Sequence, residues 1–339
     1  MGHLLGLANE LLCDIVSYLE PTAPVPMCGC PFFHNMIDLE DNHRVPLELA
    51  KSLHSVALTC HRLHDIAITR LHHYIPLMTD VGRSELFLSA LGTSRDSAAR
   101  VKFVDINAMI PSHGAIDVRC LFSLPNVHTL CIRNFHTRYY RESLPEGLYV
   151  RSSPVKVLKL IGCGVSTTFL GQVLSWPRAL KEFWYERTQD DSRDIVRGWP
   201  PESLEPLDFS CTSLVTAMSS QADSLEKFVL ARQPHCHREI YRYEDDDALK
   251  LRNFKKLKSL FVDYEFLDKF HMLYLWELLP ESLEELEVYT EEILSALFDR
   301  NQSNWLIRVL EHGVNRKRRS AWTPRLKIIR GSLDVLKTR

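Results

Sequence analysis

Glycine is scarce in this chain, with 13 glycines among 339 residues. No glycine-rich loop of the dinucleotide-binding or P-loop type occurs, so nothing supports a dehydrogenase or a kinase. The GCG around Cys163 does not fit the frame of a nucleophile turn, and no His and acid are placed to activate it. We therefore expect a non-catalytic protein that needs no cofactor.

Long apolar runs and an excess of one charge are also missing. Nowhere do about 18 apolar residues follow one another, and the N-terminal HLLGLANELL is interrupted by Asn9 and Glu10. Lys plus Arg total 41 against 43 for Asp plus Glu, a formal net charge of -2. No global field draws such a chain to nucleic acid or to an anionic membrane. We expect neither kind of partner, and neither secretion nor membrane insertion.

The cysteines form no disulfide framework. There are 9, an odd number, spread from Cys13 to Cys236, which favours a reducing, intracellular compartment. Cys28, Cys30 and His34 lie in a proline-rich stretch, where a zinc site is the alternative to a plain loop. Their C-x-C spacing is shorter than zinc sites use, so we expect no metal. The NRKRR from Asn315 is either a nuclear address or the solvated end of a helix, which leaves cytoplasm, nucleus or both.

What the chain does contain is a recurring spacing, L-x-x-L-x-L. The phrase PESLE occurs at Pro201 and again at Pro280, and the same frame recurs from Val101 onward at intervals of roughly 20 to 30 residues, with a longer last interval. The frames are Val101, Val104, Ile106; Val127, Leu130, Ile132; Val155, Leu158, Leu160; Leu180, Phe183, Tyr185; Leu204, Leu207, Phe209; Leu225, Phe228, Leu230; Leu257, Leu260, Val262; Leu283, Leu286, Val288; and a frayed Leu326, Ile329, Gly331.

Each frame predicts a short strand, and the segments between frames carry helical patterns. Phe169, Leu170, Val173 and Leu174 follow Ser166 at helical spacing, and Leu214, Val215 and Met218 follow Thr212. Further helical patterns lie at Phe270, Leu273, Tyr274 and in residues 290–313. Such units bury a shared core only when stacked, so the expected fold is α/β, an irregular repeat solenoid with a curved parallel sheet and outer helices over 95–339.

The first 75 residues follow a different pattern. Leu11, Leu12, Ile15, Val16 and Leu19 lie on one helical face, with Asn9 as the expected N-cap. A second stretch of helical pattern follows the 21–46 insertion, which makes two or three short helices in all; its apolar positions are Leu49, Leu53, Val56 and then Leu63, Ile66, Ala67, Leu71 and Tyr74. We expect a short helical module over 1–75 and a connector over 76–94. A module this small leaves apolar surface for a partner.

LANELLCDIVSYLE followed by LHSVALTCHRLHDIA resembles an F-box, the adaptor-binding module of cullin-based ubiquitin ligases. The chain departs from that family at Ala8, where proline is usual, and in the insertion. The order of module and repeats resembles the F-box and leucine-rich-repeat substrate receptors. The resemblance implies docking on a Skp-family adaptor and through it on a cullin, with the repeats binding a protein substrate. The adaptor-binding residues would be Leu7, Leu11, Leu12, Ile15, Leu19, Leu53, Val56 and Leu63. The alternative is a repeat scaffold that acts without ubiquitylation.

Alternation along the strands predicts which side chains face a substrate on the concave side. They are Glu182, Trp184, Glu186, Asp208, Phe261, Asp263, Glu285, Glu287 and Tyr289, with Ser210, Lys227, Val229 and Ser259 among them. Acids ringing aromatic anchors suit a partner segment that carries Lys or Arg. The alternative is that the acids only keep the sheet soluble and that Trp184 or Phe261 packs under a neighbouring loop.

Overall fold

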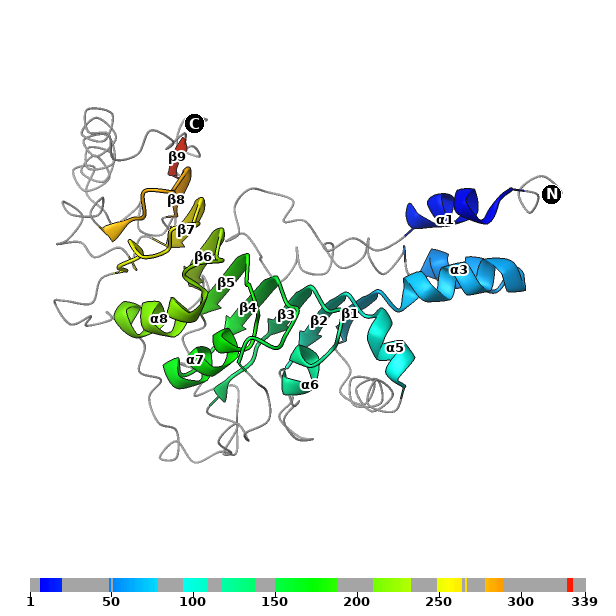
Figure 1. Ribbon diagram of the computed structural model, residues 1–339, viewed down its shortest axis with the longest axis horizontal. Helices are drawn as coiled ribbons and strands as arrows, with labels where there is room; N and C mark the ends of the chain where they lie inside the picture. The colour runs from blue at the N-terminus through cyan, green and yellow to red at the C-terminus, as the bar shows by residue number, and fades with distance from the viewer. Residues whose placement is uncertain are drawn as a thin grey trace, which may run out of the picture. The chain divides into compact units, whose positions relative to one another are not determined.

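The computed structural model describes residues 7–19, 49, 51–78, 94–108, 118–137, 150–187, 210–232, 249–263, 266, 278–289 and 328–331. The chain divides into two compact units. Unit 1 comprises Met1–Arg133 with Ser153–Val155, and unit 2 comprises Asn134–Ser152 with Lys156–Arg339. Both are built from helices and parallel strands, so the fold class is α/β (Figure 1).

Unit 1 begins with helices and continues into strands. The helices are α1 (Asn9–Ser17), residues 51–57 and α3 (His61–Leu71). The strands are β1 (Tyr74–Met78), β2 (Phe103–Asn107) and β3 (Thr129–Arg133), with α5 (Arg95–Arg100) and α6 (Val118–Phe122) between them. β1 pairs with β2 and β2 with β3, both parallel. β1 has no frame in the sequence and overlaps the expected connector. It begins at Tyr74, which was wrongly expected on a helix, because α3 ends at Leu71.

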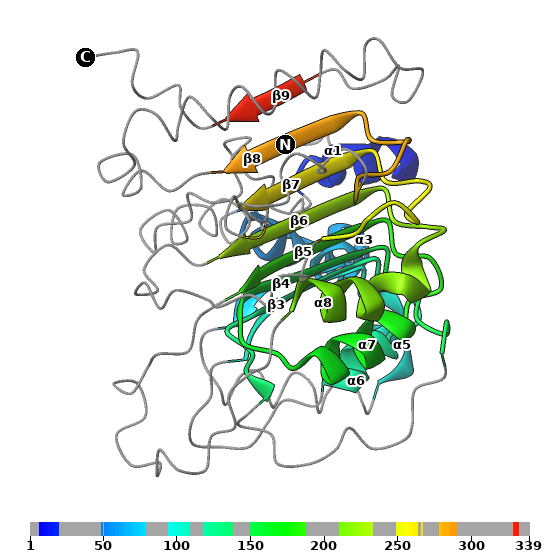
Figure 2. The same ribbon diagram turned by 90° about the vertical axis from the view of Figure 1, so that its left-hand side faces the viewer.

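Unit 2 continues the alternation of strand and return segment. Its strands are β4 (Val157–Cys163), β5 (Glu182–Arg187), β6 (Lys227–Arg232), β7 (Ser259–Asp263), β8 (Glu285–Tyr289) and β9 (Ile328–Gly331). Each pairs in parallel with the next, so the spatial order follows the order in the chain (Figure 2). The return segments include α7 (Thr167–Ser175), α8 (Cys211–Met218) and a 3-10 turn at Ser219–Gln221.

The strand frames are confirmed wherever the structure describes their side chains. The three apolar positions of the frames at Val101, Val127, Val155, Leu180, Leu225 and Leu257 are all buried, as are Leu283 and Leu286. The last, frayed frame is also a strand, with Ile329 opposite Leu286. The two apolar positions that end a frame lie two apart, so they share one face of a strand and reach one core.

The strand expected from the frame at Leu204 does not lie between its neighbours in the sequence. The frame at Leu204 was expected to add a strand between those at Leu180 and Leu225, but β5 pairs directly with β6, with Phe183 opposite Phe228. No strand from residues 204–209 can lie between them. Asp208 lies outside the described residues, and Ser210 serves as the N-cap of α8 instead of facing a substrate.

The helices of unit 2 form where the apolar spacing predicts them. In α7 the expected Phe169, Leu170, Val173 and Leu174 are all buried, and in α8 Leu214 and Met218 are. A serine hydroxyl starts each helix, because Ser166 accepts from the Phe169 N–H at 3.2 Å and Ser210 from the Ser213 N–H at 3.0 Å. Both helices lie along one face of the strands (Figures 1 and 2). The helical patterns at Phe270 and over 290–313 lie outside the described residues.

The expected cap of α1 is also wrong. The N-cap position is Ala8, whose methyl group cannot accept a hydrogen bond, and Asn9 is already helical. The Asn9 side-chain oxygen instead accepts from Arg62 Nε at 2.7 Å, and the Arg62 Nη2 donates to the Leu7 carbonyl at 2.7 Å. Arg62 therefore ties the start of α1 to α3.

Candidate functional site

The helical part of unit 1 has its own small core. Leu12, Val16, Leu53, Ala57, Leu63 and Ala67 form it. Three of the residues predicted to bind an adaptor, Leu12, Leu53 and Leu63, therefore pack inside the module. Three more, Leu7, Leu19 and Val56, are half-buried against that core. These six residues contribute to the packing of the helical module.

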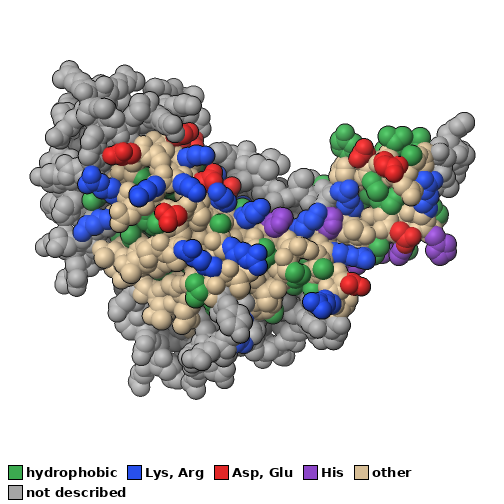
Figure 3. Space-filling model, viewed as in Figure 1, with side chains coloured by type: hydrophobic (Ala, Val, Ile, Leu, Met, Phe, Trp, Pro, Cys, Tyr) green, Lys and Arg blue, Asp and Glu red, His purple; other side chains and the backbone are tan. Residues whose placement is uncertain are grey.

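Leu11 and Ile15 lie on the outside of α1. Leu11 is 50% exposed and Ile15 is 44% exposed, and Tyr18, just after the helix, is 85% exposed. Their spacing of four and then three residues places them in one stripe along the helix. Figure 3 shows hydrophobic side chains gathered over α1. Tyr18 was missed by sequence reasoning, although it continues the same spacing. The outer stripe of α1 (Leu11, Ile15, Tyr18) is the first candidate site.

A second candidate site lies on the strands of unit 2, on the face opposite α7 and α8. Parallel pairing aligns the predicted residues in rows across the strands. One row runs Glu182, Lys227, Ser259, Glu285, and the next runs Trp184, Val229, Phe261, Glu287. We call the surface formed by these two rows the Trp184 face. The structure thus brings together most of the residues that alternation predicted there.

The centre of the Trp184 face is apolar and capped by lysines. Trp184, Val229 and Phe261 form a cluster of buried residues of their own, with Trp184 and Phe261 each 8% exposed. The Lys227 Nζ lies 4.8 Å from the Trp184 ring centroid and 5.0 Å from that of Phe261. The Lys159 Nζ also lies over the Trp184 ring, 4.5 Å from its centroid. Cations over aromatic faces attract the ring quadrupole, so these lysines are held by the cluster.

The buried indole has an unsatisfied donor. Trp184 Nε1 is buried and has no hydrogen-bond partner within the described structure. A buried N–H without an acceptor costs about 1–3 kcal/mol. Among the described residues, the Trp184 face therefore contains a buried donor without an acceptor.

The acids predicted on this face differ in how deeply they are buried. Glu182, Glu186, Glu285 and Glu287 are half-buried, whereas Asp263 is buried. Tyr289 belongs to β8, but its side chain lies outside the described residues. Glu182 and Glu285 occupy one row on either side of Lys227 and Ser259, so carboxylates flank the aromatic centre.

The equivalent strand face in unit 1 holds a buried ion pair. Arg133 Nε donates to Asp105 Oδ1 at 2.8 Å, and Arg133 Nη2 donates to Asp105 Oδ2 at 3.0 Å. The Asp105 side chain is fully buried. Two parallel bonds from one guanidinium satisfy both carboxylate oxygens. Sequence reasoning missed this pair, because it joins the middle of β2 to the end of β3.

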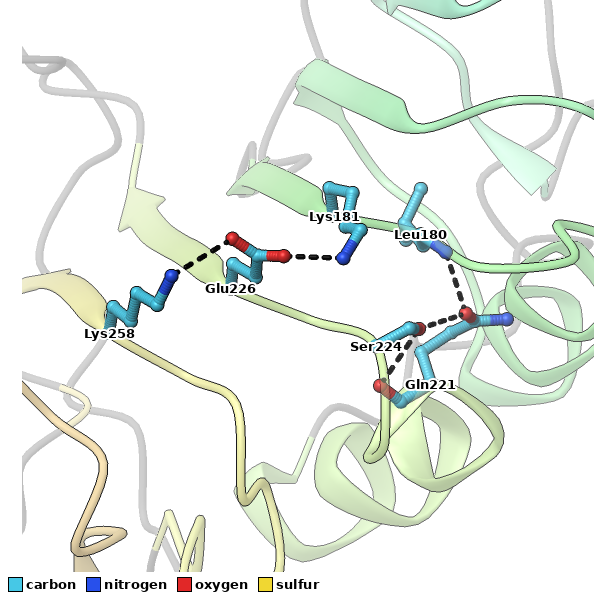
Figure 4. A network of polar contacts seen from close by, with 6 residues as sticks. All are labelled: Leu180, Lys181, Gln221, Ser224, Glu226 and Lys258. Atoms are coloured by element: carbon cyan, nitrogen blue, oxygen red, sulfur yellow. Dashed lines mark hydrogen bonds and ion pairs between the residues drawn. The ribbon is translucent and has the colours of Figure 1, made fainter.

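Two polar networks lie where the strands of unit 2 begin (Figure 4). Buried Gln221 donates from Nε2 to the carbonyls of Leu174 and Pro177, at 2.7 and 3.0 Å, and its Oε1 accepts from the Leu180 N–H at 2.9 Å. The second network joins Lys181, Glu226 and Lys258, with Lys258 Nζ 3.4 Å from the Glu226 carboxylate. The hydrogen bond from Lys181, with help from Lys258, holds the pKa of Glu226 below its ordinary 4.5.

Metal ligands do not cluster in the part of the chain that the structure describes. No group of three His, Cys, Asp or Glu there could hold an ion. The segment with Cys28, Cys30 and His34 lies outside those residues. Over the same described ranges, no helix has both the length and the apolar character to cross a bilayer.

Comparison with protein-family models and with curated proteins finds no match for this chain. The function must be inferred from the two candidate sites.

Proposed function

We propose that this protein is a non-catalytic substrate receptor of a Skp-cullin-F-box type ubiquitin ligase. Its helical part would act as an F-box that docks on a Skp-family adaptor, and the strands and helices that follow would act as an irregular leucine-rich-repeat solenoid that binds a protein substrate. The observation that carries the proposal is the outer stripe of α1, where three large apolar side chains remain exposed above a packed core. An exposed apolar stripe on so small a module is typical of a protein interface.

The adaptor contact is tested by truncating the stripe. Leu11→Ala with Ile15→Ala should abolish pull-down of a Skp-family adaptor, because dominant interface residues each cost about 2 kcal/mol or more when truncated. Glu10→Ala with Asp14→Ala is the matched control, since both side chains are exposed on the same helix. The control should bind like the wild type. Undiminished binding by the Leu11/Ile15 variant, with an unchanged circular-dichroism spectrum, would reject the F-box assignment.

The ligase role is tested by co-purification. Recovery of both adaptor and cullin with the full chain supports a ubiquitin-ligase receptor. Adaptor without cullin, or neither, supports instead a scaffold that acts without ubiquitylation. Because receptor action needs only orientation and effective concentration, no catalytic side chain is required of this chain.

For the substrate we propose the Trp184 face. The carboxylates at the two ends of one row, Glu182 and Glu285, favour Lys or Arg in a partner segment. The centre, where Lys159 and Lys227 lie over the rings, favours an acceptor oxygen of that segment, which Trp184 Nε1 lacks among the described residues. Glu285→Lys with Glu287→Lys, and separately Trp184→Ala, should reduce substrate capture while adaptor binding stays intact. Capture should also weaken as salt shortens the screening length below about 8 Å. Normal capture by both folded variants would exclude this face as the recognition surface.

A further inference from the structure

The residues that immediately precede strands β4 to β8 form a ladder of backbone hydrogen bonds that neither candidate site uses. The Lys181 N–H donates to the Lys156 carbonyl at 2.7 Å, and the Glu226 N–H to the Lys181 carbonyl at 2.8 Å. The ladder continues with Lys258 N–H to Glu226 at 2.8 Å and Glu284 N–H to Lys258 at 2.7 Å. Neighbouring strands lie about 4.8 Å apart, so these side chains leave the sheet at regular, short steps.

The carboxylate at the centre of this ladder, Glu226, is already paired with lysines. Glu226 contacts both Lys181 and Lys258, and its lowered pKa reflects these contacts. The Lys181 and Lys258 side chains remain 40% and 53% exposed. One carboxylate shared by two ammonium groups leaves a net positive charge on the ladder, and that charge faces solvent.

The turns that enter the strands add more cations. Arg178 precedes β5 and donates from Nε to the Ser152 carbonyl at 3.2 Å, while Lys250, Lys255 and Lys256 precede β7 and are exposed. The exposed acids in the corresponding described turns are Asp223 and Glu281. Figure 3 looks toward the side on which the strands begin, and Lys and Arg side chains gather over the strands of unit 2 there. We call this surface the strand-start edge; it comprises Lys156, Arg178, Lys181, Lys250, Lys255, Lys256 and Lys258.

This local excess contrasts with the formal net charge of -2 for the whole chain. Scattered surface lysines are ordinary, but here they are aligned by backbone pairing and concentrated on one edge. Such an arrangement produces a local positive potential, which attracts anionic partners and orients their approach.

The occupant that fits is an acidic polypeptide rather than a nucleic acid. Single-stranded nucleic acids need aromatic side chains on which bases stack, and Trp176 and Phe254, the aromatics of these described turns, are buried. Glu226 and Glu284 interrupt the lysines and would repel a continuous phosphate chain. A sequence pI of about 6.7 is also far from the strongly basic values of nucleic-acid-binding domains.

We propose that the strand-start edge of unit 2 docks a Glu- or Asp-rich segment of a partner polypeptide. Carboxylates spaced along an extended segment would pair with lysines that neighbouring strands present at short intervals. The edge consists of residues that precede the strands, and it shares no residue with the two rows of the Trp184 face or with α1. The inference therefore does not rest on the proposed function.

The test measures binding of a fluorescein-labelled oligoglutamate peptide to the full chain by anisotropy. Lys255→Glu with Lys256→Glu should weaken binding at least about tenfold, since each change replaces an attraction by a repulsion. Lys51→Glu with Arg95→Glu is the matched control, because it makes the same change of charge at exposed sites of unit 1. The control should bind the peptide like the wild type.

A second variant keeps the test decisive if charge reversal disturbs folding. Lys255→Gln with Lys256→Gln should give a smaller but clear loss, with an unchanged circular-dichroism spectrum. The proposal is overturned if the control loses as much affinity as the edge variants, or if the edge variants bind normally. It is also overturned if a labelled oligothymidylate of equal charge binds the wild type as tightly as the peptide does.

Discussion

Asp105 in unit 1 and Trp184 in unit 2 occupy the same position of the repeated strand frame, and both bury a polar group. The Asp105 carboxylate receives two hydrogen bonds from Arg133, whereas Trp184 Nε1 has no partner within the described structure. In the first arrangement the buried carboxylate is fully paired within the chain, so it needs no external group. The second leaves a donor beneath two lysines that finds no acceptor among the described residues, and we propose that the partner segment supplies one.

The largest effect should come from breaking the pair in unit 1. Arg133→Met leaves the fully buried Asp105 carboxylate without its guanidinium, and breaking one side of a buried pair costs about 3–5 kcal/mol. Urea unfolding, followed by hydrogen exchange in β2 and β3, measures the loss. The double change Asp105→Leu with Arg133→Met should recover most of it, because two apolar side chains need no pairing. A single-variant loss below about 1 kcal/mol would show that Asp105 does not depend on Arg133.

A similar loss is expected from a satisfied polar side chain in unit 2. Gln221→Met removes the partners of the Leu174 and Pro177 carbonyls and of the Leu180 N–H. Unsatisfied buried groups should cost about 2–3 kcal/mol in the free energy of unfolding. All six tryptophans lie in unit 2, so tryptophan fluorescence reports on this unit. Gln172→Met, on the exposed side of α7, is the control and should stay within about 0.5 kcal/mol of the wild type.

Substitution of Trp184 should change the free energy of unfolding much less than Arg133→Met or Gln221→Met does. Trp184→Phe keeps an aromatic ring for Lys227 but removes the unsatisfied N–H, so the lost contact area and the relieved donor should nearly cancel. We expect a change in the free energy of unfolding of less than about 1 kcal/mol. The same variant should reduce substrate capture, if an acceptor of the partner uses that N–H. A stability loss above about 2 kcal/mol would mean that the donor is already satisfied inside the chain.

The strands and two helices could be predicted from sequence because each depends on a local period. Leu158 and Leu160 lie two apart on a strand, and Phe169 and Val173 lie four apart on a helix, so spacing alone places each pair on one face. The rows of the Trp184 face followed from the same alternation once the frames were aligned. β1 could not be found this way, since Tyr74–Met78 contains Pro76 and lacks the frame.

The contacts between different helices and strands could not be predicted from local spacing. Leu11 and Leu12 are adjacent apolar residues of one helix, and only packing decides that Leu12 is buried while Leu11 is exposed. The Asp105–Arg133 pair requires the alignment of β2 with β3, which apolar spacing does not encode. The frame at Leu204 matches the pattern as well as its neighbours do, yet the direct pairing of β5 with β6 excludes it from that place. A local pattern states what a segment can form, and neighbouring elements decide where it is used.

The smallest expected effect distinguishes the two units by pH. Burial lowers the pKa of His72 in unit 1 below its ordinary 6.5, so the folded state favours the neutral ring. As the pH falls below about 6.5, the unfolded chain takes up a proton that folded unit 1 resists, and the stability of unit 1 declines. Glu226 in unit 2 has a pKa held below 4.5 by Lys181, so its contribution is present above about pH 4.5 and is lost as pH falls through the folded value.

Unit 1 should therefore begin to lose stability at a higher pH than unit 2. His72→Gln should remove the decline of unit 1 that begins as the pH falls below about 6.5, as measured by urea unfolding with exchange in β2 and β3. Glu226→Gln should change unit 2 by only a few tenths of a kcal/mol, roughly 0.3, because solvent screens its exposed ion pairs, and tryptophan fluorescence would follow it. If both units lose stability in parallel on acidification, and neither variant alters its own curve, then these two groups do not set the pH response, and the carboxylates elsewhere in the chain must dominate it.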